Sequence, residues 1–298
     1  VWTDCFAQAI AELHKAGGGV LTVPTGEYST GPIELCSNME LHLEPGAVIR
    51  FLNDPAAFPL QECQYEGRIS HRPKPCLSAF NAENVALTGS GVLDGCGAPW
   101  WAAQRARTLA NGRPYLLHFE NVTHLRVCGV QLRNSPAWTV HPLNCVDVLI
   151  EDVSICNPYN SPNTDGINPE SCRDVRILNC RVDVGDDCIT LKSGTEETPS
   201  PAPCENIVIA NCLLVHGHGG IVIGSEMSGG VRNVTVTNCV FTGTDRGLRV
   251  KTRRRRGGCV ENLRLSNLVM ERVFCPFVFN MYYSCGTAEK DRWVWEKT

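Results

Sequence analysis

A repeat of short apolar–polar segments runs from about residue 84 to residue 265, and it limits the possible folds more than any other feature of the sequence. In each copy, a polar residue precedes aliphatic residues that alternate with polar ones. The copies are Asn84–Leu87, His124–Val127, Asp147–Ile150, Asp174–Ile177, Asn206–Ile209, Asn233–Val236 and Asn262–Leu265. Successive copies begin 40, 23, 27, 32, 27 and 29 residues apart. Alternation with a period of two predicts a short strand with one buried face in each copy.

The spacing of these strands favours a solenoid. Repeats of roughly 20–50 residues that consist of strands and turns, with almost no helix signal, are typical of β-solenoids. A propeller needs about 40 or more residues per blade, and the spacing of leucines in leucine-rich repeats is absent here. We therefore predict an all-β chain that folds as a parallel β-helix and forms a single domain over residues 1–298. A chain trimmed at its termini is an open alternative.

The first 80 residues do not follow the repeat. Residues 1–20 predict a helix that Thr3 or Asp4 caps, with one apolar face and three glycines at its end. Such a helix suits the open end of a solenoid, because the terminal coil would otherwise expose its core and its strand edge. The stretch 54–75 contains four prolines, and we expect it to form a loop.

Several of the 17 cysteines fall at two fixed positions of the repeat, where valine or leucine stands in other copies. These cysteines are Cys145, Cys172 and Cys204 at one position, and Cys180, Cys212 and Cys239 at the other. Because cysteine alternates with small apolar residues, we expect free thiols in the core, with disulfides as the alternative. The asparagine that recurs at 179, 211, 238 and 267 suits a tight turn, with its amide bonded to the backbone of the neighbouring coil.

The composition argues against several functions. A net charge of -4 and a pI near 6.1 indicate no general nucleic-acid-binding surface. No apolar stretch approaches the roughly 20 residues that span a bilayer, so no membrane partner is predicted. Because no CxxC or CxxH pair occurs, we predict no metal site and no cofactor. Charges in the first 15 residues argue against a signal peptide, and free thiols favour a reducing compartment. We expect a cytoplasmic protein, or a secreted one if a leader has been trimmed.

The second strand of each coil is preceded by residues that carry chemistry. Aligned on their first aliphatic residue, these segments are Thr164–Ile167, Asp186–Ile189, His218–Ile221 and Asp245–Leu248. Equivalent positions on adjacent coils lie about 4.8 Å apart. We therefore expect Asp165 and Asp187 to be neighbours, with Asp186 and His218 beside them. The outward positions that follow form two expected rows, His141, Asn168, Thr190 and Arg249 in one, Lys192 and Lys251 in the other.

The aspartates allow three interpretations. A single aspartate before a strand is often only a turn residue. A calcium site is possible, but such sites usually draw more oxygen ligands, and Arg249 and Lys251 would compete with the ion. Three carboxyl groups this close raise one another's proton affinity, and a raised pKa is what a general acid needs. We therefore favour catalysis.

Four motifs resemble the signatures of polygalacturonases, which form glycoside hydrolase family 28. The motifs are Asn163–Gly166, Gly185–Asp187, Gly217–Gly219 and Arg249–Lys251. They occur in the family's order and on consecutive coils, and the single departure is Val250, where isoleucine is commoner. The resemblance covers most of the chain. Trp100–Trp101 and Gly224–Met227 look most like the bacterial branch, which trims galacturonan from chain ends.

The resemblance implies a right-handed parallel β-helix and an exo-acting, inverting hydrolase of α-1,4-galacturonosyl linkages in polygalacturonate or pectin. It implies Asp186 as the general acid, with Asp165 and Asp187 holding and deprotonating the attacking water. It also implies that His218 tunes the acid. Inverting enzymes usually hold their carboxyl groups roughly 6.5–9.5 Å apart, which is wider than neighbouring coils allow, so inversion rests on the resemblance alone.

The resemblance also implies a set of substrate contacts. Arg249 and Lys251 would bind a galacturonate carboxylate, which suits the bidentate fork of arginine. Tyr283 resembles a subsite tyrosine of the family. Asn168 and Lys192 either line substrate subsites or are outward-facing strand residues without a role in binding.

Other residues keep two interpretations each. The run Arg253–Arg256 is either a solvated turn or the binding site of a second uronate carboxylate. Trp100 and Trp101 either stack on sugar rings or are buried, and a subsite role for His141 is a guess. The stretches 54–75 and 195–203 are candidates for closing one end of the cleft.

Three rival functions remain after the sequence has been considered. A rhamnogalacturonan or xylogalacturonan hydrolase would keep the fold and the chemistry but cut another bond. A pectate lyase would need calcium ligands and an arginine base. A non-catalytic carbohydrate-binding β-helix would have no reason to keep the paired aspartates and His218.

Overall fold

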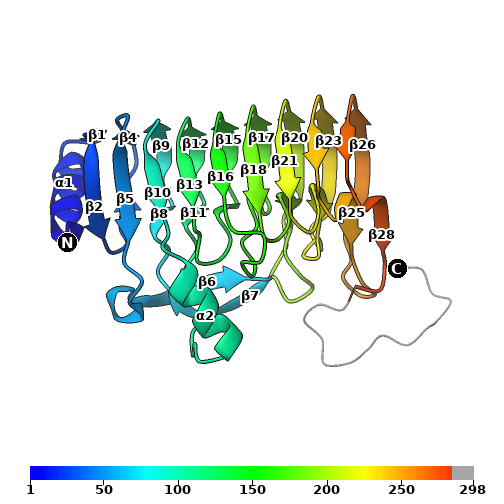
Figure 1. Ribbon diagram of the computed structural model, residues 1–298, viewed down its shortest axis with the longest axis horizontal. Helices are drawn as coiled ribbons and strands as arrows, with labels where there is room; N and C mark the ends of the chain where they lie inside the picture. The colour runs from blue at the N-terminus through cyan, green and yellow to red at the C-terminus, as the bar shows by residue number, and fades with distance from the viewer. Residues whose placement is uncertain (284–298) are drawn as a thin grey trace.

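In the computed structural model, which describes residues 1–283, the chain winds into a solenoid of stacked coils (Figure 1). Each coil contributes one strand to each of two sheets, and both sheets contain nine parallel strands within the described residues. A third side of the solenoid is built from two shorter parallel sheets. The predicted right-handed parallel β-helix is confirmed. Within the described residues, no helix is long and apolar enough to cross a membrane.

The strands of the first sheet are β1 (Gly19–Val23), β4 (Met39–Leu43), β9 (Glu83–Gly89), β12 (Thr123–Cys128), β15 (Val146–Glu151), β17 (Arg173–Leu178), β20 (Cys204–Ala210), β23 (Val231–Thr237) and β26 (Val260–Ser266). Seven of these nine strands contain the copies of the predicted repeat, and the other two, β1 and β4, precede it. In β17, Val175 and Ile177 point into the core and are fully buried, while Asp174 and Arg176 face solvent. This alternation is the period of two that the repeat predicts.

The second sheet follows the first after a short turn in every coil. Its strands are β2 (Gly26–Thr30), β5 (Ala47–Phe51), β10 (Val92–Asp94), β13 (Gln131–Arg133), β16 (Ser154–Cys156), β18 (Arg181–Val184), β21 (Leu213–His216), β24 (Val240–Thr242) and β27 (Val269–Glu271). Single buried residues such as Ile155 and Phe241 anchor these short strands to the core.

The third side carries the residues predicted to be functional. Its strands are β3 (Ile33–Leu35), β8 (Leu77–Phe80), β11 (Leu117–Glu120), β14 (Val140–Leu143), β19 (Ile189–Leu191), β22 (Ile221–Ile223), β25 (Arg246–Lys251) and β28 (Cys275–Asn280). Ile167 joins the two shorter sheets, because it forms parallel bridges with Val140 and Ile189. The third side is therefore continuous along the solenoid.

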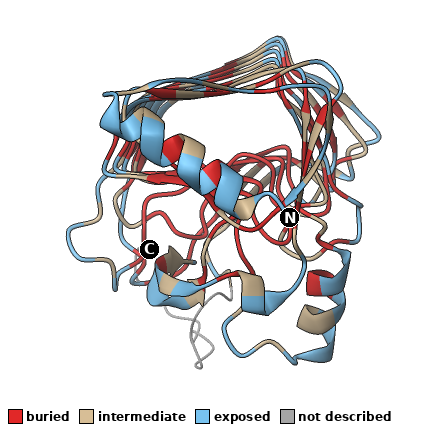
Figure 2. Cartoon of the chain, turned by 90° about the vertical axis from the view of Figure 1, so that its left-hand side faces the viewer, coloured by how far each residue is buried: buried red, intermediate tan, exposed pale blue. Residues whose placement is uncertain are grey.

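Helix α1 (Thr3–Lys15) lies across the N-terminal end of the solenoid (Figure 2). Its Phe6 and Ile10 are buried against the first coil, as expected for a cap. The prediction that Thr3 or Asp4 caps the helix is wrong, because the N-cap is Trp2 and no side chain bonds there. The hydroxyl of Thr3 instead accepts a hydrogen bond from the backbone N–H of Gly31, at 2.8 Å.

The stretch 54–75 is not the irregular loop that its prolines suggested. It contains a short 3-10 helix, η1 (Pro55–Ala57), and an antiparallel hairpin of β6 (Leu60–Tyr65) and β7 (Arg68–Pro73). The four prolines lie at or beyond the ends of the hairpin, so they do not interrupt its pairing. The hairpin runs along the long axis of the solenoid, beside helix α2 (Ala98–Ala106) (Figure 1).

The cysteines at fixed repeat positions are free and buried, which confirms the prediction. The recurrent asparagines also form turns, each with a left-handed backbone. The amides of Asn211, Asn238 and Asn267 do not bond backbone as predicted, because each donates to the equivalent asparagine one coil earlier. The Nδ2 of Asn211 donates to Oδ1 of Asn179 at 3.1 Å, and the Nδ2 of Asn238 donates to Oδ1 of Asn211 at 3.4 Å. Asn267 continues this ladder.

The ladder predicts two separable losses of stability at Asn211, whose φ is 59°. Asn211→Gly removes the hydrogen bonds only, and we expect it to lower the free energy of unfolding by about 1 kcal/mol. Asn211→Ala also strains the left-handed backbone, and we expect a loss of about 2 kcal/mol. Urea unfolding followed by circular dichroism measures both. Equal losses would show that the backbone conformation does not need asparagine or glycine here.

Candidate active site

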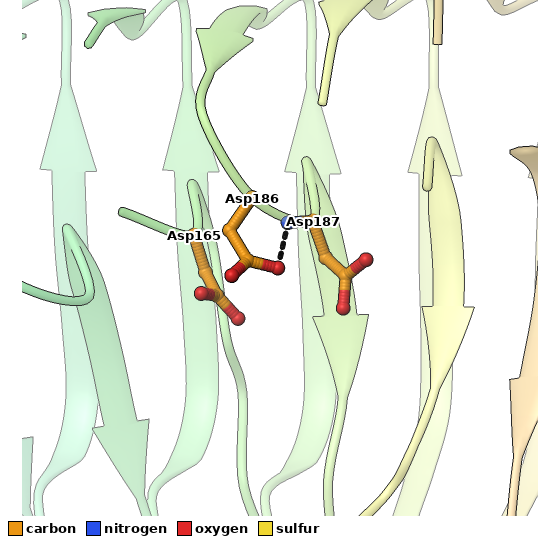
Figure 3. A group of neighbouring side chains, drawn as sticks. All are labelled: Asp165, Asp186 and Asp187. Atoms are coloured by element: carbon orange, nitrogen blue, oxygen red, sulfur yellow. Dashed lines mark hydrogen bonds between the residues drawn. The ribbon is translucent and has the colours of Figure 1, made fainter. Parts of the chain in front are cut away.

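Asp165, Asp186 and Asp187 form one cluster on the third side of the solenoid (Figure 3). Asp186 and Asp187 lie in the turn between β18 and β19, and Asp165 lies one coil earlier. The backbone N–H of Gly166 donates to the carbonyl oxygen of Asp187 at 2.9 Å, and this pairing of coils makes the two aspartates neighbours. One carboxylate oxygen of each residue lies within 4.8 Å of the others, as the coil spacing predicts.

Asp187 is held by two cations from the coil two further along the chain. Its Oδ2 lies 2.5 Å from the Nζ of Lys251, and its Oδ1 lies 3.2 Å from Nη1 of Arg249. All three side chains are nearly or fully buried. Burial alone would lower the pKa of Lys251, but the charge of Asp187 outweighs it and raises that pKa. The predicted carboxylate-binding pair thus also neutralises a catalytic candidate.

His218 and Asp186 form a second ion pair, with Nδ1 of the histidine 3.2 Å from Oδ1 of the carboxylate. The hydrogen bond to Asp186 raises the pKa of His218. Burial would raise the pKa of Asp186, but the hydrogen bond and charge of His218 outweigh burial and lower it. The backbone N–H of Asp187 adds a hydrogen bond of 2.9 Å (Figure 3). The expectation that crowding raises the pKa of this residue is therefore wrong in this structure.

Asp165 is the aspartate of the cluster whose pKa is raised. Burial, followed by the charge of Asp186, raises the pKa of Asp165 well above its ordinary value, although Lys192 opposes this shift. The Nδ2 of Asn168 donates to Oδ2 of Asp165 at 3.0 Å. Asn168 is itself fully buried, so in this structure it orients Asp165 and offers no surface for the predicted substrate contact.

Lys192 and Glu226 form a buried ion pair in the floor of the cleft, with Nζ and Oε2 2.6 Å apart. Ser225 donates a further hydrogen bond to Glu226 at 2.7 Å, and the Lys192 ammonium lies 4.5 Å from the ring centroid of Trp138. Burial would raise the pKa of Glu226, but the charge of Lys192 lowers it to about 2. Lys192 thus lines the cleft as predicted, while Glu226 was not recognised from the sequence as its partner.

Tyr283 lies beside the two cations. Its ring centroid is 5.3 Å from the Nζ of Lys251 and 5.5 Å from Cζ of Arg249. A tyrosine face attracts cations at such distances. Tyr283 therefore lies next to the predicted carboxylate-binding pair, and its role in a subsite stays a prediction.

A cleft of about 340 Å³ is lined by the three aspartates together with Lys192, Glu226, Lys251 and Tyr283. The hairpin β6–β7 contributes Glu66 and Arg68 to it, and the loop after β19 contributes Thr195–Glu197. Arg253 and Arg256 also line it and are buried, so the first of the two interpretations of this run, a solvated turn, does not hold for these two residues. The cleft is thus bounded by segments that lie far apart in the sequence.

The hairpin is fixed to the floor of the third side by several contacts. The Nε2 of Gln64 donates to Oε1 of Glu170 at 2.7 Å, and the Tyr65 ring stacks on Trp138 with centroids 4.9 Å apart. At the tip of the hairpin, the hydroxyl of Thr195 donates to the carbonyl oxygen of Gly67 at 3.3 Å. The hairpin therefore reaches the loop after β19 and meets it beside the aspartates.

Beneath the hairpin, His141 is fully buried. Its Nε2 lies 3.0 Å from Oε2 of Glu170, and its Nδ1 lies 3.0 Å from Nδ1 of His118. Burial lowers the pKa of His141 to about 4. The suggested subsite role is therefore not supported. Trp100 and Trp101 are also buried, so they do not offer a face for sugar stacking.

The three aspartates could also hold a metal ion, since within the described residues they are the group of carboxylates close enough to share one. Lys251 and Arg249 already contact two oxygens of Asp187 and would compete with an ion there. The donor set therefore fits acid–base chemistry better than cation binding.

The buried Lys192–Glu226 pair predicts a pH-dependent loss of stability. The folded-state pKa of Glu226 is lowered, so the pair stabilises the protein above the ordinary glutamate pKa of 4.5 and ceases to do so as pH falls towards about 2. We expect Glu226→Gln to lower the free energy of unfolding by about 3–5 kcal/mol at pH 7, because it leaves Lys192 unpaired. Unfolding of both proteins between pH 7 and pH 2 should show the difference shrinking. A difference that stays constant with pH would contradict this account.

Comparisons with known proteins agree with this geometry. The family model described as glycosyl hydrolases family 28 matches residues 21–291. A probable polygalacturonase from Vitis vinifera is 34% identical over an alignment of 287 residues, and the match covers 92% of this chain and 58% of that protein. An endo-polygalacturonase from Pectobacterium carotovorum subsp. carotovorum is 30% identical over 86% of this chain and 65% of its own length. The chain thus spans less than two thirds of both relatives.

A solved structure supports the same relationship. The hyperthermoactive exopolygalacturonase from Thermotoga maritima is 35% identical and superimposes with a TM-score of 0.78, over 90% of this chain and 71% of that one. The sequence match, the parallel β-helix and the aspartate cluster agree with one another. The chain therefore belongs to family 28 of the glycosyl hydrolases.

Proposed function

We propose that this chain hydrolyses α-1,4-galacturonosyl linkages in polygalacturonate or pectin. The observation that carries the proposal is the clustering of three carboxyl groups with Lys251 and Tyr283 in one cleft, where Arg249 also contacts Asp187. Carboxyl groups can supply acid–base catalysis, and the cations match the carboxylate of a uronic acid. The relatives named above are a probable polygalacturonase, an endo-polygalacturonase and an exopolygalacturonase, which supports this substrate class.

Asp186 is the proposed general acid that protonates the leaving glycosidic oxygen. Its pKa is lowered in this structure, so it must receive its proton from within the cluster. Asp165 has the raised pKa, and its carboxyl oxygen lies within 4.8 Å of one on Asp186, a distance that one bridging water spans. His218 keeps Asp186 acidic, and a more acidic group donates its proton more readily.

Asp187 and Asp165 are the proposed residues that hold and activate the attacking water. Lys251 and Arg249 fix the orientation of Asp187 through their contacts with its two oxygens. The carboxylate of the galacturonate would bind the remaining donors of the same two cations. Inversion of the anomeric centre is part of the proposal on the family alone. The spacing of the carboxyl groups does not support it, because they lie closer together than the roughly 6.5–9.5 Å usual for inverting enzymes.

Exo action is supported by the hairpin. The tip of β6–β7 meets the loop after β19 through Gly67 and Thr195, and Arg68 lies 3.8 Å from Glu197 across the same junction. In the proposed exo action, this junction closes the cleft on one side, so a long chain that continued past the aspartates would meet the hairpin. A chain end can enter without meeting it.

A rhamnogalacturonan or xylogalacturonan hydrolase is the second candidate, because the same chemistry could serve a different sugar in an outer subsite. The endo-xylogalacturonan hydrolase of Aspergillus tubingensis shares the fold, with a TM-score of 0.56 at 15% identity. The pair Arg249–Lys251 favours a uronate at the cleavage point, so we place polygalacturonate first. A pectate lyase would leave an unsaturated product that absorbs in the ultraviolet, whereas a hydrolase would not.

A time course of products from polygalacturonate tests the proposal. We expect free galacturonate from the outset with little loss of viscosity, and proton NMR should show the β-anomer before mutarotation. Asp186→Asn should lower kcat by about 10²–10⁴-fold, because it removes the general acid. The variant should still bind oligogalacturonate, which separates catalysis from binding.

Each result of this time course decides one part of the proposal. A ladder of oligomers would keep the chemistry and overturn exo action, and a first product in the α-form would overturn inversion. If wild type and Asp186→Asn both released nothing from polygalacturonate, the substrate would be wrong and rhamnogalacturonan would be tested next.

His218 predicts a shift of the pH profile. Its hydrogen bond and charge lower the pKa of Asp186, so His218→Gln should raise the apparent pKa of the acid. Loss of activity at high pH reports deprotonation of the acid, so that limb of the kcat/KM profile should move to higher pH in the variant. The maximal rate should fall, because a weaker acid protonates the leaving group less readily. A profile that keeps its shape and only drops would mean that His218 does not act through Asp186.

A further inference from the structure

A chain of buried hydrogen bonds runs beneath the hairpin β6–β7. The Nε2 of His118 lies 3.4 Å from Oε2 of Glu120, and its Nδ1 lies 3.0 Å from Nδ1 of His141. The Nε2 of His141 lies 3.0 Å from Oε2 of Glu170, whose Oε1 accepts a hydrogen bond of 2.7 Å from Gln64 of the hairpin. Both histidines and Glu170 are fully buried, while the Glu120 side chain is 32% exposed. The chain therefore exchanges protons with water mainly at its Glu120 end.

This chain needs one proton more than two neutral histidines supply. Three contacts link its four titratable groups, and each contact needs one N–H or O–H donor. A carboxylate only accepts hydrogen bonds, and a neutral imidazole carries a single N–H. Two neutral imidazoles thus serve two of the three contacts, and the third contact requires an additional proton. Either one histidine is an imidazolium or one carboxyl group is protonated.

The surroundings of the four groups favour His118 as the carrier of this proton. The hydrogen bond from His118 lowers the pKa of Glu120, which keeps that group a carboxylate. Burial lowers the pKa of His141 to about 4, so His141 is neutral and its single N–H faces Glu170. The Nδ1 of His141 must then accept a hydrogen bond from His118, which donates from both of its ring nitrogens.

The buried carboxylate of Glu170 depends on this charge. The titratable or charged groups around the two histidines are Glu120, Glu170, Tyr115, Cys63, Arg72 and Lys192. The thiol and the phenol are neutral, because burial raises the pKa of each. Lys192 is paired with Glu226, and Arg72 donates to a backbone carbonyl oxygen. A buried carboxylate without an opposite charge is unfavourable, and a charged His118 offsets that cost for Glu170.

The hairpin is attached to this chain at two atoms of Gln64. Its Nε2 donates to Glu170, and its carbonyl oxygen accepts a hydrogen bond of 2.6 Å from the Tyr115 hydroxyl. The Tyr115 ring stacks on His118, with centroids 5.0 Å apart and an interplanar angle of 15°. An aromatic face attracts a positive charge, so this stacking also favours a charged His118. The tip of the same hairpin lines the cleft beside the aspartates.

We propose that His118 is a buried imidazolium, and that His118, His141 and Glu170 are positioning residues, which hold the hairpin over the cleft while this proton is bound. When the proton is lost at higher pH, two protons remain for three contacts, and Glu170 stays a buried carboxylate without compensation. Opening of the hairpin would let water reach Glu170, so the closed position becomes less favourable as pH rises. The charge on His118 does not depend on the proposed function, whereas its effect on catalysis does.

Nitrogen NMR of protein labelled with 15N-histidine tests the charge, because it distinguishes an imidazolium from either neutral tautomer. The signals of His118 are those that His118→Phe removes. We expect an imidazolium at pH 6 that becomes neutral as pH rises, with His141 neutral throughout.

Hydrogen exchange of residues 60–73, expressed as protection factors, tests the hold on the hairpin. We expect protection to fall by about 10–100-fold as His118 loses its proton, which is the value of a hydrogen bond to a charged group. His118→Phe keeps the stacking on Tyr115 but not the proton, so its hairpin should have low protection at every pH. His124→Phe is the matched control, because His124 is exposed and lies 2.8 Å from Asp147 on the next coil. It should keep the pH dependence of the wild type.

A neutral His118 at pH 6 would overturn the inference, and so would the same pH dependence of hairpin protection in His118→Phe as in wild type. Should His118→Phe not fold, Gln64→Leu removes the attachment from the side of the hairpin. It should lower protection and leave His118 charged.

The activity on polygalacturonate tests the positioning role separately. We expect His118→Phe to raise KM more than it lowers kcat, because the hairpin lines the cleft but carries none of the three aspartates. An unchanged KM in a variant with a loosened hairpin would overturn the positioning role. An inactive wild type would overturn the proposed function and leave the NMR and exchange results as they are.

Discussion

The backbone pairing of each coil with the next is the constraint on which the rest of the structure depends. Along the third side, Gly166 donates to Asp187, and Cys188 donates to Gly219, at 2.9 and 2.8 Å. These bonds hold residues that lie 21 and 31 positions apart in the sequence at the spacing of adjacent strands. A register shift of one residue would turn every side chain to the opposite face, and the apolar interior forbids such a shift. The cluster of carboxyl groups is therefore a consequence of the fold.

Burying several carboxyl groups together is electrostatically unfavourable. The pairing of the coils also brings cationic side chains next to these groups, and their charges offset the cost. The compensating groups come from the coil of Asp187 and from the next two coils. They are Lys192, His218 and Lys251, and each pairs with a carboxylate at the rim or the floor of the cleft. Asp165 has no cation at hydrogen-bonding distance in the structure's described part, and its pKa is accordingly raised. The distribution of partners, more than the crowding of acids, thus decides where the proton resides.

The sequence contained the repeat, so the strands, the core cysteines and the column of site residues could be predicted from periodicity and coil spacing. The hairpin β6–β7 could not, because its position depends on contacts such as Gln64 with Glu170, 106 residues apart, which no local pattern records. The order of pKa values within the cluster also depends on side-chain direction. His218 turns towards Asp186 and not towards Asp165, and a register of Cα positions does not determine that choice.

The charges at the junction of the hairpin and the loop after β19 bear on the proposed exo action. Glu66 and Glu197 stand at the junction of the hairpin and the loop after β19, while the cations Lys251, Arg253 and Arg256 line the cleft inside it. A polyuronide carries a negative charge on every sugar, so a chain that ran past the junction would bring carboxylates against acidic side chains. A chain end that stopped at the junction would reach Lys251 and Arg253 without passing Glu66 and Glu197. The acidic residues at the junction would therefore act in the same direction as the steric block that the proposed exo action assigns to the hairpin.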